Sequence, residues 1–232
     1  MAGGYWRIAS GLLLVPAAVA GLSSCSGPST ATASMAKASS DTGLTAAQLR
    51  GALLTRVNGV AAAAPASSGK YSSLTAANTS KNGANAGQVT PKTCAGAAAG
   101  FNPTALAASP AAAVTFKVGS NGVSEVLIAS SAKTAATALA GHIPAECAKY
   151  QAKVAGKTYT YGATEQKVTG IGQQAQVLNV QAADAKSNNL WSLIYRGKGF
   201  VGTVTVVGPN ASKEAVTELG QQAYAYAAKT LS

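Results

Sequence analysis

Acidic and histidine side chains are scarce in this chain, which has seven Asp and Glu residues and a single His among 232 residues. Acid–base and metal-dependent enzymes need several titratable groups that converge on one site. Asp41 lies in a polar segment, and Glu214 and Glu218 fall near the start of an expected C-terminal helix, where carboxylates suit the helix dipole. The other acids are widely separated and lie in no motif: Glu125, Glu146, Glu165 and Asp184. We therefore expect no catalytic residues, no metal site and no cofactor.

The single histidine, His142, is poorly placed for catalysis. Glu146 is within helical reach, but Pro144 lies between the two and disfavours the helix that would bring them together. No G-x-S-x-G stretch supplies a nucleophile elbow. Gly170-Ile171-Gly172 opens an expected strand rather than a helix, so it does not fit a dinucleotide-binding loop. The ordinary interpretation of His142 is a surface or turn residue.

A long hydrophobic run is also missing. The apolar stretch 8–22 contains Pro16 and is shorter than the roughly 20 residues that a membrane-spanning helix needs. One cation, Arg7, precedes it and small residues follow, which is the layout of an export signal. The alternative is a buried N-terminal helix.

The four residues Leu22-Ser23-Ser24-Cys25 follow this stretch, and they resemble the lipobox of bacterial lipoproteins. The resemblance implies that residues 1–24 are a signal peptide and that Cys25 receives diacylglycerol and acyl chains such as palmitate. Each buried methylene contributes about 0.8 kcal/mol, so two or three long chains form a firm anchor. The expected location is the extracytoplasmic face of the cell membrane.

The remaining sequence divides into a tether and a single folded domain. Residues 25–43 are mostly Ser, Thr, Ala, Gly and Pro, a composition that buries too little surface to order itself. Residues 44–232 have a length that suits one extracellular domain. The cations are scattered singly without interleaved aromatics, so the net charge of +11 of the whole chain does not indicate nucleic-acid binding. Anionic lipid or cell-wall polymers fit it better, and simple solubility is the remaining interpretation.

Cysteine is rare, with three residues in the chain. With Cys25 assigned to lipidation, Cys94 and Cys147 remain as an even pair in an oxidising compartment, which predicts a disulfide. A loop of this length gives a bridge worth roughly 4 kcal/mol. Two free buried thiols are the alternative, and a metal site lacks further ligands at suitable spacing.

Hydrophobic periodicity predicts an α+β fold with an antiparallel sheet of about five to six strands and helices packed on one face. A capping box at Thr45 and Gln48 starts a helix whose apolar stripe continues to Val57. Residues 61–88 are expected to form a long irregular connection. The other expected elements are a hairpin at 112–118 and 123–129, a helix at 132–141, strands at 157–161, 176–182, 190–196 and 200–207, and a C-terminal helix.

Aromatic residues make up only 6% of the chain, and those on expected strands include Tyr159, Tyr161, Trp191 and Tyr195. Aromatic walls bind apolar or sugar-like ligands, so these residues are the candidate ligand-binding positions. The alternative is that they are simply the largest core residues of an alanine-rich domain.

The folded part weakly resembles the extracellular sensor-type domain of some mycobacterial serine/threonine kinases. The resemblance rests on the leading helix, on Pro144-Ala145-Glu146-Cys147, and on the hairpin LIYRGKGFVGTVTV before the closing helix. Those kinase domains carry two disulfides, whereas this chain has cysteines for one. Together with the lipobox, the pattern looks like an actinobacterial surface lipoprotein.

Three functions are compatible with these features. The leading hypothesis is a lipid-anchored, non-catalytic sensor-like or ligand-binding domain whose ligand is a small molecule, a lipid or a cell-wall component. A carrier of lipid or glycolipid, with a cavity between sheet and helices, is the alternative. A cell-wall hydrolase is the third, and it requires carboxylates clustered in a cleft.

Overall fold

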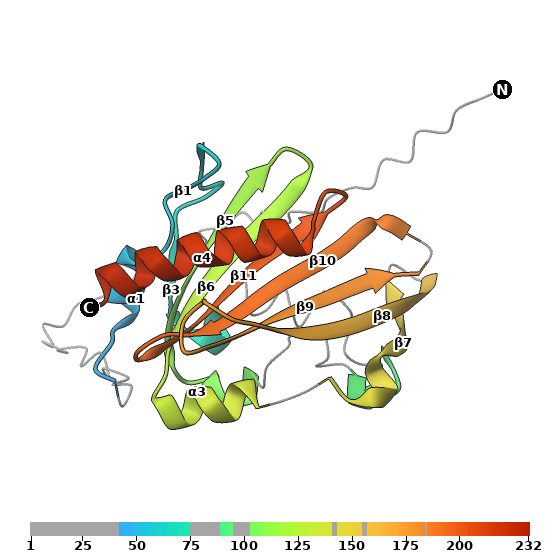
Figure 1. Cartoon of the computed structure of the whole chain (residues 1–232), viewed down its shortest axis with the longest axis horizontal. Coiled ribbons are helices and arrows are strands. Elements are labelled where there is room, and N and C mark those ends of the chain that lie inside the picture. The colour runs from blue at the N-terminus through green and yellow to red at the C-terminus, as the bar shows by residue number, and fades with distance from the viewer. Residues whose placement is uncertain (1–41, 75–88, 95–102, 141–142, 155–156, 184) are drawn as a thin grey trace, which may run out of the picture. The chain divides into compact units, whose positions relative to one another are not determined.

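The fold is built on a wide antiparallel sheet, seen in a computed structural model that describes residues 42–74, 89–94, 103–140, 143–154, 157–183 and 185–232 (Figure 1). Nine described strands form it. Their order across the sheet is β3 (Ser67–Lys70), β5 (Pro110–Val118), β6 (Asn121–Ala129), β11 (Phe200–Gly208), β10 (Ala185–Arg196), β9 (Gln174–Ala182), β8 (Lys157–Val168), β7 (Lys149–Val154) and β4 (Val89–Thr90).

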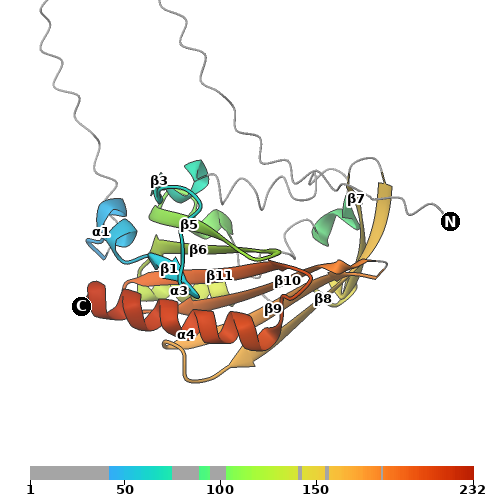
Figure 2. The ribbon, with the colours of Figure 1, turned by 90° about the horizontal axis from the view of Figure 1, so that it is seen from above.

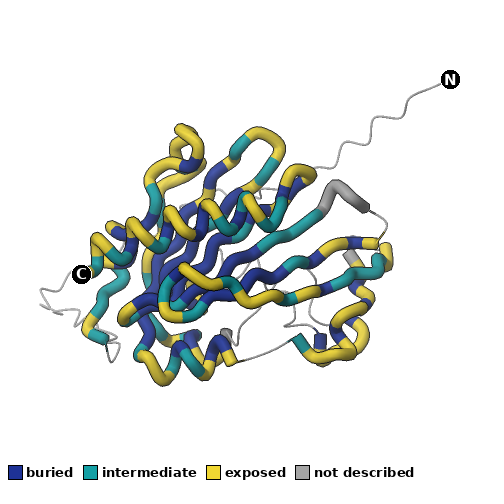
Figure 3. The backbone as a smooth tube through the Cα atoms, in the orientation of Figure 1, coloured by how far each residue is buried: buried dark blue, intermediate teal, exposed yellow. Residues whose placement is uncertain are grey.

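The central strands are rich in Val, Ile, Leu and Ala and are buried on both faces, as Figure 3 shows for the middle of the sheet. Tight turns join the expected hairpins. Val118 pairs with Asn121 across the β5–β6 turn, where Gly119 has a positive φ of 60°, a conformation that glycine adopts without strain. Arg196 pairs with Val201 at the start of the β10–β11 hairpin. Both hairpins predicted from the sequence are confirmed.

Helices cover both faces of the sheet (Figures 1 and 2). On one face, α1 (Ala46–Gly51) and α4 (Lys213–Thr230) pack on a core that includes Leu127, Leu193 and Val204. On the other face, α3 (Ala132–Leu139) and the 3-10 helix η4 (Pro103–Leu106) pack on a second cluster that includes Ile128 and Ile194. Successive side chains of a strand point to opposite faces of the sheet, so neighbouring residues such as Leu127 and Ile128 pack in two separate cores.

The expected fold class is wrong in two respects: the sheet has nine described strands rather than five to six, and helices pack on both of its faces. Strands β3 and β7 carry Ser, Gly, Lys and Gln, and β4 has only two residues, so their hydrophobic signal is weak. They form because each adds hydrogen bonds to an edge that already exists. The face on which a helix packs also depends on long-range pairing.

Near the N-terminus of the domain, the helix is shorter than expected, and the connection that follows it is more regular than expected. The capping box is present, with Gln48 N–H donating to Thr45 Oγ1 over 3.2 Å and Thr45 N–H donating to Gln48 Oε1 over 2.8 Å. The helix ends at Gly51, and Val57 lies in the small hairpin of β1 (Arg56–Val57) and β2 (Val60–Ala61). Within the expected irregular connection, β3 joins the edge of the sheet.

The predicted disulfide is confirmed. Cys94 and Cys147 are bonded, with their Cα atoms 5.3 Å apart. The bridge ties the segment after β4 to the 3-10 helix η5 (Ala145–Cys147). It lies in a third buried cluster with Tyr150, Ala152 and Val180, so it closes the end of the sheet formed by β7, β8 and β9.

Several predictions concern residues outside the described part of the chain. These are the signal peptide 1–24, the lipidation at Cys25, most of the tether 25–43, His142 and Asp184. Among the described helices, none combines the length and apolarity needed to cross a membrane.

Candidate functional site

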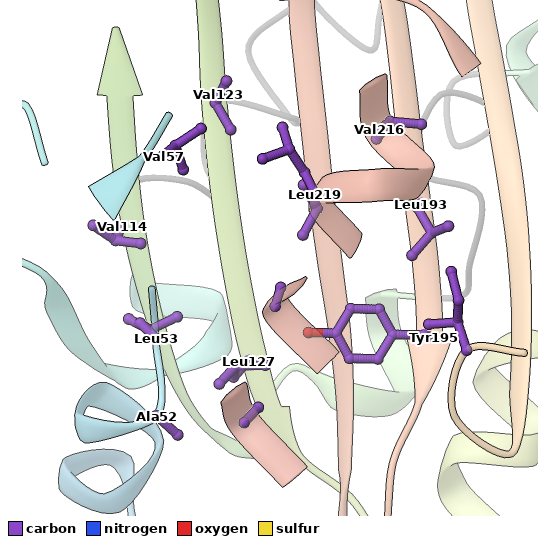
Figure 4. Close-up of a cluster of buried hydrophobic side chains, with 14 of the residues drawn as sticks. Ala52, Leu53, Val57, Val114, Val123, Leu127, Leu193, Tyr195, Val216 and Leu219 are labelled. Atoms are coloured by element: carbon purple, nitrogen blue, oxygen red, sulfur yellow. The ribbon is translucent and has the colours of Figure 1, made fainter. Parts of the chain in front are cut away.

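Tyr195 and Trp191, two of the four candidate aromatics, belong to the core on the α4 face. Tyr195 is fully buried and packs edge-to-face with Phe200 and Tyr224, at ring-centroid distances of 6.2 and 5.7 Å. Figure 4 shows its ring among the labelled core side chains. Trp191 is half-buried and packs against the same cluster. The ring of Tyr195 is thus placed as a packing residue.

The space for the Tyr195 ring comes from Gly202 on the neighbouring strand. Tyr195 and Gly202 are cross-strand partners in β10 and β11. A Cβ atom at position 202 would lie 2.2 Å from Cζ of Tyr195. The backbone φ of Gly202 is not in the left-handed region, so its conformation alone does not require glycine. Glycine is required because the Tyr195 ring lies close to the backbone at this position.

Tyr159 and Tyr161, the other two candidates, lie half-buried on β8 at the disulfide-closed end of the sheet. The ring of Tyr161 stacks on that of Tyr150 from β7, with 5.5 Å between centroids, and Tyr159 lies 6.5 Å from Tyr161. Burial raises the pKa of Tyr150 to about 12, with a smaller contribution from Tyr161. Burial also raises the pKa of Tyr161. These phenols stay neutral and available as hydrogen-bond donors at physiological pH.

The same face of β8 continues from these tyrosines into an open pocket of about 340 Å³. Side chains at alternate positions share one face of a strand, so Ala163, Glu165 and Lys167 line up with Tyr159 and Tyr161. The pocket is lined by Ile143, Pro144, Ala145, Ala148, Ala163, Glu165 and Lys167. We call this hollow the β8 pocket. Sequence reasoning missed it because it ended the strand at Tyr161, although the alternating pattern continues to Lys167.

Three features of the local sequence create the β8 pocket. The disulfide at Cys147 and the 3-10 turn of η5 hold the wall against β8. The lining positions 145, 148 and 163 are alanines, which leave space beside the strand where larger side chains would fill it. Glu165 Oε2 accepts a hydrogen bond from Ile143 N–H over 3.2 Å, which fixes the rim.

The β8 pocket combines a half-buried carboxylate, an exposed ammonium and an apolar wall. Glu165 and Lys167 are two positions apart on the same face of one strand, so opposite charges lie side by side in the pocket lining. Such a pair suits a ligand that carries both an ammonium and a carboxylate group. Glu165 supplies the single carboxylate among its lining residues.

The remaining acids do not converge with Glu165. Glu125 on β6 faces the core on the α4 side, whereas Glu165 faces the opposite side of the sheet. Glu146 is exposed on η5. Within the described ranges, no group of three or more His, Cys, Asp or Glu side chains is arranged to hold a metal ion.

Glu125 is the most perturbed carboxyl of the described chain. Its side chain is 1% exposed, and Leu54 N–H donates a hydrogen bond to its Oε2 over 2.8 Å. Burial raises its pKa from the ordinary 4.5 to about 7, and the bond from Leu54 lowers it by less. Its Oε1 and the hydroxyl of Tyr195 have no hydrogen-bond partner among the residues that the structure describes. This carboxyl joins the end of α1 to the sheet.

Comparison with known proteins gives weak structural likeness only. No protein-family model matches the chain, and no curated protein matches it. The extracellular domain of PknH from Mycobacterium tuberculosis is similar with a TM-score of 0.40 and 12% identity, over 72% of this chain and 78% of that one. An uncharacterized protein from Mycobacterium smegmatis, the Rv0999 ortholog, is similar with a TM-score of 0.31 and 14% identity, over 62% of this chain and 74% of that one. The weak resemblance to a mycobacterial kinase extracellular domain, expected from the sequence, thus recurs among solved structures.

Proposed function

We propose that this chain is a lipid-anchored extracytoplasmic lipoprotein whose folded part is a non-catalytic, sensor-like or ligand-binding domain. The export-signal layout and the lipobox at Cys25 support the anchor. The Cys94–Cys147 disulfide supports an oxidising compartment, because such bonds persist mainly outside the cytosol. The separation of Glu125 and Glu165 on opposite faces of the sheet supports a role without catalysis.

The β8 pocket carries the ligand-binding part of the proposal. Its volume is near the lower end of the roughly 300 to 1,000 Å³ of small-molecule sites. Its ligand is a small zwitterion, such as a free amino acid or a short peptide, whose ammonium pairs with Glu165 and whose carboxylate pairs with Lys167. The apolar wall at Ile143 and Pro144 then contacts the side chain of that ligand.

The two other functions gain less support. A lipid carrier needs a cavity between sheet and helices, but the space between the sheet and α4 is occupied by packed side chains such as Leu193, Tyr195 and Leu219. A hydrolase needs carboxylates that face one cleft, and the described acids face different sides of the sheet. We therefore keep the binding domain as the proposal.

The anchor is tested in cells supplied with an alkyne-tagged palmitate. The parent chain should become labelled and fractionate with the membrane, and Cys25→Ser should lose both properties. Cys94→Ala is the matched control, because it removes a cysteine that is predicted not to be acylated. Label that persists on Cys25→Ser would contradict the lipobox assignment.

The pocket is tested by calorimetric titration of the purified full chain with free lysine, glutamate and the dipeptide alanyl-alanine. Binding of at least one should weaken about tenfold in Glu165→Gln, a change that keeps an oxygen to accept from Ile143 N–H. Glu146→Gln is the matched control on the nearby exposed turn and should bind as the parent does. Equal affinity in both variants would show that the β8 pocket is not the site.

The carrier alternative is distinguished by mass spectrometry of the membrane-extracted protein under native and denaturing conditions. A native mass that exceeds the denatured, acylated chain by the mass of a lipid would favour the carrier. Matching masses would leave the binding domain as the function to pursue.

A further inference from the structure

A second surface of the domain lies on the opposite side of β8 from the pocket. Helix α4 crosses β11 and β10, and β9, β8 and β7 extend beyond it (Figure 1). Beyond the helix, most residues of these strands on the α4 face are polar, in contrast to Leu193 and Val177 in the core that α4 covers. We call this surface the polar face; it consists of Lys149, Gln151, Lys153, Thr158, Thr160, Thr164, Gln166, Asn179, Gln181 and Trp191.

Strand register places these residues together. Trp191 pairs with Asn179, and Asn179 pairs with Thr164, so the three form a row across β10, β9 and β8. Gln151 of β7 pairs with Thr160 of β8 in a parallel row nearer the edge. Directly opposite residues of an antiparallel pair point to the same side. The polar face is therefore a continuous sheet surface about 14 Å wide from β7 to β10, at about 4.8 Å between strands.

The charge on the polar face has one sign. Lys149 and Lys153 are exposed on β7, and Lys213 at the start of α4 reaches over the sheet to donate from Nζ to Gln166 Oε1 at 2.7 Å. The sequences of β7 to β10 contain a single acid, Glu165, whose side chain lines the pocket on the other face. Glu214 is exposed in the first turn of α4, beside Lys213. The strands themselves present cations without carboxylates.

We propose that the polar face binds an anionic polysaccharide, a glycan that carries carboxylate or phosphate groups. Exposed Gln and Thr side chains supply the donors and acceptors that match sugar hydroxyls. The half-buried indole of Trp191 offers apolar ring surface at the inner border of this surface. The lysines at its outer border pair with the acidic groups of the polymer. This site is independent of the β8 pocket and adds a second, polymeric ligand to the proposed function.

The test uses the full chain with Trp6→Phe, which leaves Trp191 as the one remaining tryptophan of two. Polygalacturonate is the probe, and uncharged dextran is the comparison. Titration with polygalacturonate should change Trp191 fluorescence saturably, whereas dextran should bind at least tenfold more weakly. The double variant Lys149→Glu, Lys153→Glu should weaken polygalacturonate binding at least tenfold.

The matched control is Lys70→Glu with Lys133→Glu, which changes the net charge equally at exposed positions on β3 and α3. This control pair should change the affinity for polygalacturonate by less than about twofold. The uncharged variant Gln181→Ala, at an exposed β9 position, should weaken binding about threefold without changing the charge. Glu165→Gln should leave it unchanged, which separates this site from the pocket.

Three results would overturn the proposal. Equal weakening in both lysine pairs would show that general positive charge, and not the polar face, attracts the polymer. Equal binding of dextran would remove the requirement for acidic groups. Binding to vesicles that contain phosphatidylglycerol, with none to polygalacturonate, would assign the surface to membrane lipid instead.

Discussion

Replacement of Glu125 by Gln should change how stability depends on pH. The carboxyl of Glu125 is buried in an apolar core and holds one hydrogen bond, from Leu54 N–H. Burial raises its pKa from 4.5 to about 7, so the folded state binds the proton more tightly than the unfolded state does. Between those two pH values the unfolded chain has released the proton and the folded chain retains it. The free energy of unfolding must therefore fall as pH rises through this window and level off above it.

The magnitude follows from the linkage between protonation and folding. Each pKa unit corresponds to about 1.4 kcal/mol, so the contribution of Glu125 falls by roughly 3 kcal/mol between pH 4 and neutral pH. The titratable group that faces Glu125 is Tyr195 from β10, and Tyr224 of α4 packs against the Tyr195 ring. Burial holds the pKa of Tyr195 well above 10, so this phenol does not titrate in the window.

The assay is urea denaturation followed by circular dichroism at pH 4.5, 6.0 and 7.5. Glu125→Gln retains an oxygen that accepts from Leu54 N–H and does not ionise. It should match the parent near pH 4.5 and exceed it by about 2 to 3 kcal/mol at pH 7.5. Glu146→Gln, at an exposed carboxyl, should follow the parent at every pH. A constant difference between Glu125→Gln and the parent across the pH range would refute the reasoning.

Three further predictions concern the core beneath α4 and the bridge. In urea titrations, Gly202→Ala should lower the free energy of unfolding by about 2 to 3 kcal/mol, because the added Cβ would overlap the Tyr195 ring. The control Gly122→Ala has open space around the added Cβ and should change the free energy of unfolding by less than about 1 kcal/mol. Tyr195→Phe removes a buried hydroxyl without a described partner, so calorimetry should show stability unchanged or raised by up to about 1 kcal/mol; a loss above 2 kcal/mol would contradict the packing role. Replacing Cys94 and Cys147 together by Ala should cost roughly 4 kcal/mol, and an unchanged melting temperature would contradict the bracing role of the bridge.

Local features of this protein were predictable from sequence because they depend on neighbouring residues. The capping box at Thr45 and Gln48, the turns at Gly119 and Gly199, and the start of α3 after Ser131 each use contacts within a few positions. The disulfide was predictable for a different reason: with Cys25 assigned to the lipobox, two cysteines remained. In these cases residue type and spacing carry most of the physical information.

The candidate site was predictable only in part. Tyr159 and Tyr161 were correctly placed on a strand, but β8 continues to Val168, and the pocket beside Glu165 depends on a wall from Ile143 to Ala148 that the disulfide holds in place. Sequence composition does not say that small side chains from separate segments will meet and leave a hollow. The burial of Tyr195 and the half-burial of Trp191 likewise depend on what packs over β10.

The sequence by itself determined the local conformations, the apolar runs that become central strands, and the cysteine pair. Only the tertiary structure decided the order of the strands, the two faces that the helices cover, and the positions of the acids. Strand β6 pairs with β11, far along the chain, and this pairing orders the core in which Glu125 meets Leu54. Such contacts join residues distant in sequence, and burial of both sheet faces, rather than local propensity, selects among the possible pairings.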